Sequence, residues 1–176
     1  MGQSEFLLVP ALCLDFDGTI RRSKSGQAFI ASPEDIELFP DVERVLWSYR
    51  RAEWLICGVT NQGGVAYGYR TPEQVEEENH YTTSLFAENP FHSIIACLSH
   101  PDGSIHPYNH RSLWRKPDYG MLAHLEWQAL ERGVVIDWDQ SVVVGDRTED
   151  QEMALRARVE FRWAWDFFGR ERPNGQ

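Results

Sequence analysis

The feature that most constrains the fold is an apolar run that stops abruptly at two carboxylates. Residues 9–14 have the composition of a strand buried on both faces of a parallel sheet, and Asp15 and Asp17 follow directly. Gly18 then permits a sharp exit from the strand. Residues i and i+2 of an extended segment point the same way, so both carboxylates can face one ligand. Because ligands bind beyond the carboxyl ends of parallel strands, this position predicts a functional site.

The rest of the chain alternates between apolar runs and segments with helical spacing. We expect further strands over residues 54–59, 91–98, 141–144 and 159–163, and helices over 42–50, 73–88, 115–130 and 151–157. Strands that alternate with helices form parallel sheets covered on both faces. The sequence therefore predicts an α/β fold, a Rossmann-like three-layer α/β/α sandwich with a mostly parallel sheet. The short spacings leave no room for a separate cap domain, and 176 residues fit a single domain over 1–176.

Charge and cysteine content narrow the class of protein. The net charge of −10 opposes a polyanionic partner such as duplex DNA, so we do not expect a nucleic-acid partner. No segment approaches the ~20 apolar residues of a membrane span, and residues 1–5 lack the features of a secretory leader. Cys13, Cys57 and Cys97 lie within or at the end of apolar runs, which indicates buried, reduced thiols. We expect a cytoplasmic protein without membrane attachment.

Two further segments have the composition of a phosphate site. Thr60 and Asn61 end the strand over 54–59 and lead into a glycine-rich turn, whose backbone N–H groups can hold phosphate oxygens. Arg115 and Lys116 open the next predicted helix, so that the helix dipole adds to the charge of the lysine. The planar fork of an arginine suits a phosphate or a pair of sugar hydroxyls. These segments predict a site for a small phosphorylated substrate.

Acidic residues return after the strand over 141–144, at Asp146 and Asp150. Mg²⁺ prefers octahedral oxygen ligands and usually keeps several waters. Asp15, Asp146, the backbone carbonyl of Asp17 and a phosphate oxygen would make a suitable ligand set. The sequence therefore predicts a Mg²⁺ site beside the phosphate site.

Together these residues resemble the four motifs of the haloacid dehalogenase superfamily of phosphotransferases. The first motif is complete in Asp15, Asp17, Gly18 and Thr19, Thr60 and Lys116 match the second and third, and Gly145, Asp146 and Asp150 match the fourth. The resemblance implies that Asp15 attacks phosphorus to form an aspartyl-phosphate. It implies that Asp17 protonates the leaving oxygen and then activates water, while Thr60, Lys116 and Mg²⁺ hold the phosphoryl group. It leaves Asp150 as either a water-mediated metal ligand or a partner of Lys116.

A narrower resemblance points to one branch of that superfamily, which contains histidinol phosphatase and heptose bisphosphate phosphatase. It rests on residues 38–42, 59–66, 68–69 and 115–122. The resemblance implies a phosphomonoesterase acting on a small sugar phosphate or amino-alcohol phosphate. It also implies that Arg115 contacts the substrate.

Many members of this branch bind a structural zinc ion through Cys-x-His and Cys-x-Cys. Here Cys97 remains, whereas Ser99, Ser112 and Trp114 stand at the other three positions. A substitute set of Cys97 with His100, His106 and His110 has allowable ligand types but matches no standard spacing. We therefore expect Mg²⁺ and do not expect zinc.

Some alternatives remain open at this point. The polar segment 21–32, with Arg21, Arg22 and Lys24, is either a mobile flap over the site or a solvated loop. A polynucleotide 3′-phosphatase would use the same chemistry. A catalytically idle protein would bind a partner through the aromatic segment 162–168. Otherwise we expect this segment to belong to the core, at the last strand. The sequence leaves monomer and homodimer open.

Overall fold

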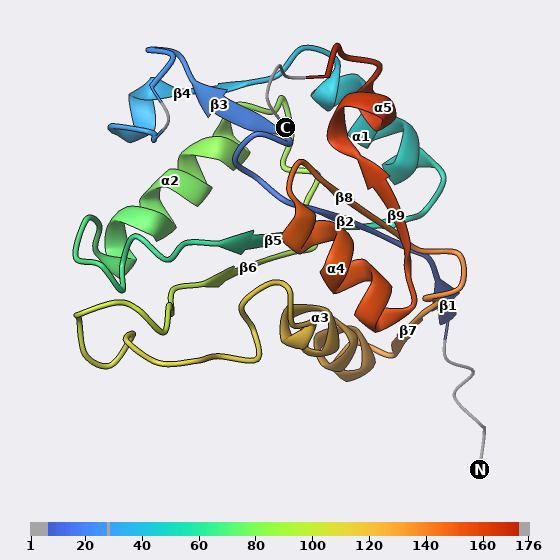
Figure 1. Cartoon of the computed structure of the whole chain (residues 1–176). Coiled ribbons are helices and arrows are strands. Elements are labelled where there is room, and N and C mark those ends of the chain that lie inside the picture. The colour runs from blue at the N-terminus through green and yellow to red at the C-terminus, as the bar shows by residue number, and fades with distance from the viewer. Residues whose placement is uncertain (1–6, 28, 173–176) are drawn as a thin grey trace.

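A parallel five-stranded sheet forms the centre of the molecule. The computed structural model describes residues 7–27 and 29–172, and the expectation about residues 1–5 lies outside that range. The sheet comprises β2 (Ala11–Leu14), β5 (Leu55–Asn61), β6 (Ser93–Cys97), β8 (Val142–Gly145) and β9 (Glu160–Trp163). The order is β6-β5-β2-β8-β9, and each neighbouring pair is parallel (Figure 1). The predicted α/β class with a mostly parallel sheet is confirmed.

Helices cover both faces of this sheet. On one face lie α3 (Gly120–Glu131) and α4 (Thr148–Ala157), and on the other lie α1 (Val42–Arg51) and α5 (Ala164–Phe168). Successive residues of a strand point to opposite faces, so Ala11 and Cys13 pack with the first pair of helices while Leu12 and Leu14 pack with the second. All four side chains are fully buried. The predicted three-layer sandwich follows from this two-sided burial.

Register places the carboxyl-terminal parts of the three central strands side by side. Leu14 of β2 pairs with Gly58 of β5 and with Val144 of β8. A side chain at Gly58 would lie 2.5 Å from the ring of Phe16, so the glycine lets that ring pack closely against β5. As a result, the residues that follow the three strands emerge together at the carboxyl edge of the sheet.

Smaller elements stand at the two edges of the sheet. At the amino edge, β1 (Leu7–Val9) pairs in parallel with β7 (Val134–Ile136). Beyond the carboxyl edge, β3 (Arg21–Ser23) pairs antiparallel with β4 (Ile36–Leu38). A 3-10 turn at Pro33–Asp35 lies directly before β4. Helix α2 (Pro72–Ser84) packs against β4 and this turn (Figure 1). The segment predicted as a flap therefore begins with a paired strand.

Two predicted elements differ from the structure. The helix predicted from Arg115 begins only at Gly120, because the residue before a proline, here Lys116, is disfavoured in helical conformation. Residues 164–168 form α5 rather than a continuation of the last strand, and Trp165 is buried on that helix. Cys13, Cys57 and Cys97 are buried and free, as predicted.

Candidate active site

The carboxyl ends of the central strands open into a cleft of about 900 Å³. Asp15, Thr60 and Asp146 enter this cleft from the ends of β2, β5 and β8. Lys116 and Asp150 complete its floor. The structure thus brings together residues that the sequence placed in four separate motifs.

Lys116 is the centre of the polar network in the cleft. Its ammonium group lies 2.6 Å from Asp15 Oδ1, 2.6 Å from Asp150 Oδ1 and 3.0 Å from the carbonyl oxygen of Val59. A lysine ammonium has three N–H donors, so these three acceptors use its full capacity. Asp150, which the resemblance left as a metal ligand or a partner of Lys116, lies here as that partner. The side chain of Lys116 is 3% exposed, so little water screens these contacts.

Burial and crowding of charge set the protonation of this network. Burial, together with the nearby carboxylates of Asp150 and Asp146, raises the pKa of Asp15 to about 7, although Lys116 opposes the shift. Burial favours the neutral amine of Lys116, but Asp15 and Asp150 outweigh it and raise the pKa of Lys116. Lys116 therefore stays charged at neutral pH, while Asp15 titrates near pH 7.

Three acids of the cleft have the arrangement of a cation site. Ligand oxygens of Asp15, Asp146 and Asp150 all lie within 4.8 Å of one another. A side chain at Gly18, where φ is +85°, would lie 2.3 Å from Asp146 Oδ2, so the glycine keeps open the space beside that carboxylate. When all are deprotonated, these acids and Asp17 carry four negative charges against one each on Lys116 and Arg21, and a divalent cation matches the difference. The residues therefore fit a divalent metal ion.

Asp17 is held by two residues that the sequence did not identify as part of the site. Arg21 Nε donates to Asp17 Oδ1 at 2.7 Å, and Gln62 Nε2 donates to Asp17 Oδ2 at 2.8 Å. Burial opposes the charge of Asp17, but these two donors prevail and lower its pKa. Asp17 is therefore an ionised carboxylate in the ligand-free cleft.

Arg21 joins this carboxylate to helix α2. Its Nη1 donates to Thr82 Oγ1 at 2.8 Å and to the carbonyl oxygen of Glu78 at 3.3 Å. Arg21 is fully buried, so the interpretation of this residue as part of a solvated loop is wrong. The only sequence signal was its place two residues after the first motif. Glu78 is likewise buried, and it pairs with Arg70.

The other predicted phosphate ligands have different surroundings. The side chain of Asn61 accepts from the backbone N–H of Lys116 at 3.0 Å and donates to the carbonyl of Lys116 at 3.1 Å. Asn61 therefore positions Lys116. Thr60 is buried with its hydroxyl 3.0 Å from Gln62 Nε2. Arg115 lines the cleft and donates to the carbonyl of Ser99 at 3.2 Å.

The loop that follows β6 uses its histidines and cysteine in other contacts. His100 Nδ1 lies 3.0 Å from the Tyr67 hydroxyl, and His110 Nδ1 lies 2.7 Å from the carbonyl oxygen of Pro107. Cys97 Sγ donates to the carbonyl of Ser99. Over 7–27 and 29–172, the group of side chains close enough to hold a metal ion is the acidic one.

A parallel sheet with this set of acids and one lysine at its carboxyl edge defines a phosphatase of the haloacid dehalogenase type. A family model described as "Polynucleotide kinase 3 phosphatase" matches residues 11–168. The D-glycero-D-manno-heptose-1,7-bisphosphate 7-phosphatase of Chlorobaculum tepidum is 32% identical over 148 residues, which cover 83% of this chain and 73% of the relative. The enzyme of that name from Thermosynechococcus vestitus is 30% identical over 84% of this chain and 74% of its own.

Solved structures agree with this comparison. A HAD-like phosphatase of Mesorhizobium loti has a TM-score of 0.75 and 28% identity, over 90% of this chain and 73% of its own. The D,D-heptose 1,7-bisphosphate phosphatase of B. bronchiseptica, complexed with magnesium and phosphate, shares the fold at a TM-score of 0.68 and 24% identity, over 88% of this chain and 78% of its own. The chain belongs to the heptose bisphosphate phosphatase branch of the haloacid dehalogenase phosphatases and is a phosphoric monoester hydrolase.

This result removes one of the alternatives, the catalytically idle binding protein. Within the part of the chain that the structure describes, no helix is long and apolar enough to cross a bilayer.

Proposed function

We propose that the protein is a Mg²⁺-dependent phosphomonoesterase that cleaves a small sugar phosphate through an aspartyl-phosphate on Asp15. One observation carries this proposal. The buried carboxylate of Asp15 lies at the floor of an open cleft, 2.6 Å from the ammonium of Lys116 and beside the carboxylates of Asp146 and Asp150. A nucleophile, a fixed positive charge and a cation site thus meet where a phosphate can enter.

The proposed reaction has two steps. In the first, an oxygen of Asp15 forms a bond to phosphorus, the ester P–O bond breaks, and Asp17 gives a proton to the leaving oxygen. In the second, Asp17 takes a proton from water, whose oxygen attacks phosphorus and releases phosphate from Asp15. Lys116 offsets negative charge on the transferring group throughout.

The resting state of Asp17 suits the second step. Arg21 and Gln62 lower the pKa of Asp17, which favours the ionised form that a general base needs. A phosphate dianion in the cleft would raise that pKa, because like charges disfavour ionisation, and so prepare Asp17 as the acid. The two roles then alternate with the occupancy of the cleft.

A divalent cation completes the proposed site. Asp15, Asp146 and the backbone carbonyl of Asp17 would hold it, with Asp150 acting mainly as the partner of Lys116. When bound, it would supply charge neutralisation that lets the acids and a phosphate share the cleft. The magnesium in the B. bronchiseptica enzyme supports the choice of Mg²⁺.

The proposed substrate class rests on the relatives and on the rim of the cleft. Both relatives compared above act, by their names, on a sugar bisphosphate. At the rim, the rings of Tyr67 and Tyr69 are stacked, with centroids 5.8 Å apart, and Tyr69 is 81% exposed. Aromatic faces and arginines such as Arg115 suit a sugar with several hydroxyls.

A substrate screen tests the proposal. Phosphate release should be measured with Mg²⁺ on sugar phosphates, amino-alcohol phosphates and 3′-phosphorylated oligonucleotides, and a sugar phosphate should give the highest kcat/KM. Activity should disappear with a chelator and return with Mg²⁺. Hydrolysis that persists in chelator would contradict the metal requirement, and an amino-alcohol phosphate as best substrate would correct the class.

One alternative retains specific support. The family model that matches the chain bears the description of a polynucleotide 3′-phosphatase, which supports a 3′-phosphorylated oligonucleotide as the alternative substrate. The net charge of −10 weighs against it. A strong preference for 3′-phosphorylated oligonucleotides that weakens steeply with salt would establish this alternative.

A further inference from the structure

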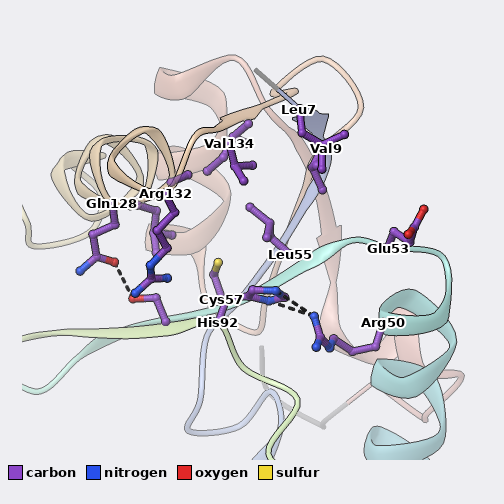
Figure 2. A pocket seen from close by; sticks show the side chains of 14 residues that line it. Leu7, Val9, Arg50, Glu53, Leu55, Cys57, His92, Gln128, Arg132 and Val134 are labelled. Carbon is purple, nitrogen blue, oxygen red and sulfur yellow. Dashed lines mark hydrogen bonds between the residues drawn. The ribbon is translucent and has the colours of Figure 1, made fainter. Parts of the chain in front are cut away.

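A second cavity, of about 360 Å³, lies at the opposite edge of the sheet (Figure 2). We refer to it as the amino-edge cavity, and its lining includes Arg50, Leu55, His92, Leu125, Arg132 and Ile136. It opens at the amino ends of β5 and β6, whereas the catalytic cleft opens at their carboxyl ends. The two sites therefore share strand β5 but no lining residue.

Two arginines and a histidine line this cavity against one acid, the exposed Glu53. Figure 2 shows Arg132, at the end of α3, and Arg50, in the last turn of α1, on opposite sides of His92. In the described ranges neither guanidinium lies within ion-pair distance of a carboxylate. Glu53 also lines the cavity, but its carboxylate points away from the other side chains in Figure 2. In a chain with a net charge of −10, this local excess of cations stands out.

Hydrogen-bond donors in the cavity outnumber their acceptors. The backbone N–H of Ile56 lies 3.2 Å from His92 Nδ1, and Arg50 Nη1 lies 2.8 Å from His92 Nε2. A neutral imidazole accepts at only one nitrogen, so one of these donors lacks an acceptor. Arg50 Nε is buried and has no hydrogen-bond partner in residues 7–27 and 29–172. An incoming anion would satisfy these donors.

The charge balance indicates how many negative charges the ligand carries. Helices α1 and α3 end at the cavity, and each helix end contributes about half a negative charge. Two arginines against two helix ends leave roughly one positive charge inside the cavity, because the carboxylate of Glu53 is exposed and directed away from it. The excess therefore matches a single negative charge.

The walls indicate the rest of the ligand. Leu125 and Ile136 are buried apolar side chains that line the cavity, and Leu55 and Val134 extend the apolar surface. A free inorganic anion would leave this surface uncovered, whereas an apolar group would fill it. Guanidinium groups pair with carboxylates through two parallel hydrogen bonds.

We propose that the amino-edge cavity binds a small organic monocarboxylate, whose charged end lies between Arg50 and Arg132 and whose apolar end rests on Leu125 and Ile136. This site goes beyond the proposed phosphatase function and does not depend on it. It gives the protein a second ligand, of a chemical class distinct from the phosphorylated substrate proposed for the catalytic cleft.

Titration of the intact protein with hexanoate, followed by calorimetry and by amide chemical shifts, tests this proposal. Hexanoate should bind with a Kd near ~1 mM or below and shift the amide signals of Leu55, His92 and Ser93. Hexanamide, which has the same shape without the charge, should bind at least ~10-fold more weakly, as expected when a charged hydrogen bond is lost. Acetate and inorganic phosphate, which lack the apolar part, should also bind at least ~10-fold more weakly.

A matched pair of variants locates the site. Arg132→Gln should weaken hexanoate binding at least ~10-fold. Arg51→Gln removes a neighbouring exposed arginine that does not line the cavity and should leave the affinity unchanged. Equal affinity for hexanoate and hexanamide, equal binding by Arg132→Gln and the native protein, or no shifts at ~10 mM hexanoate would each overturn the proposal.

Discussion

Acids cluster at one edge of the sheet and arginines at the other, and at each edge one group, Asp15 or His92, is harder to ionise. At the carboxyl edge, burial with Asp150 and Asp146 nearby raises the pKa of Asp15 to about 7. At the amino edge, burial with Arg50 and Arg132 nearby lowers the pKa of His92. The same two physical causes therefore act with opposite sign at the two ends of β5.

The difference shows that each edge lacks a counterion of a particular kind. The carboxyl edge has a cluster of three carboxylates that a divalent cation and a phosphate-binding lysine can organise. The amino edge has an excess of guanidinium and N–H donors that an organic anion can satisfy. Its walls are apolar, so its ligand is expected to be less polar than a sugar phosphate.

Asp15→Asn should impair the catalytic edge of the sheet and leave the amino edge unchanged. The substitution keeps the size of the side chain but removes the attacking charge, so kcat should fall by at least ~10³. Hexanoate binding at the amino edge should not change. Asp139→Asn, at an exposed turn, is the matched control and should keep full activity. Turnover above a hundredth of the native rate in Asp15→Asn would refute Asp15 as nucleophile.

Asp17→Asn should separate the two acids within the catalytic edge. Loss of the proton donor should be severe with alkyl phosphates and milder for the first step with an aryl phosphate, whose leaving group needs no proton. Because the second step still needs a base, a rapid-quench course with the aryl ester and Mg²⁺ should show a burst of phenol and then slow turnover. Asp15→Asn should show no burst. The reverse pattern would exchange the roles of the two residues.

The pH dependence of Mg²⁺ affinity should report the raised pKa of Asp15 at the carboxyl edge. Since the pKa of Asp15 is raised from 3.8 to about 7, its proton must leave before a cation binds. Mg²⁺ affinity should therefore rise about tenfold per pH unit up to about pH 7 and then level off. Calorimetry in buffers of different ionisation enthalpy would measure the released proton.

In the metal-free protein, the raised pKa of Asp15 stabilises the fold at low pH, and this contribution is lost as pH rises through about 7.

Arg21 and Arg22 offer the finest test, because each pairs with an acid at 2.7 Å. Arg21 is 0% exposed and also bonds to α2, whereas the side chain of Arg22 is 51% exposed. Arg21→Gln should lower the free energy of unfolding by about 2–3 kcal/mol, since it leaves buried acceptors without donors. Arg22→Gln should change it by about 0.5 kcal/mol or less. Urea denaturation of both variants would show whether the flap segment is structural, and equal losses would contradict that assignment.

Local pattern was enough to predict most of the fold and the central acids. Strands buried on both faces produce continuous apolar runs, and Asp15, Thr60 and Asp146 follow those runs directly. The residues that hold the acids were harder to predict. Arg21 reaches Thr82, 61 positions away, and Gln62 reaches Asp17 across 45. Such contacts depend on how separate segments pack, which periodicity does not record.

The start of α3 and the helix α5 were missed for a related reason. The charge of Lys116 suggested a helix end, but Pro117 moved the start of the helix to Gly120 and left the lysine in a turn tied to Asn61. The run at 164–168 is rich in aromatic residues, which favour strands by propensity. Packing of Ala164 and Phe168 against the sheet overrides that preference.

The reach of Lys116 has a consequence for how the protein becomes active during synthesis. Its ammonium joins Asp15, made 101 positions earlier, to Asp150, which the ribosome adds later still. The first motif therefore leaves the ribosome before its partners exist, and strand β8, which Asp146 follows, must pair with β2 before the acids meet. Such distant contacts form late in folding, because the chain must first close a long loop, which costs conformational entropy. We therefore expect a chain that ends before Asp150 to lack phosphatase activity, since the site and the last layers of the fold are completed together.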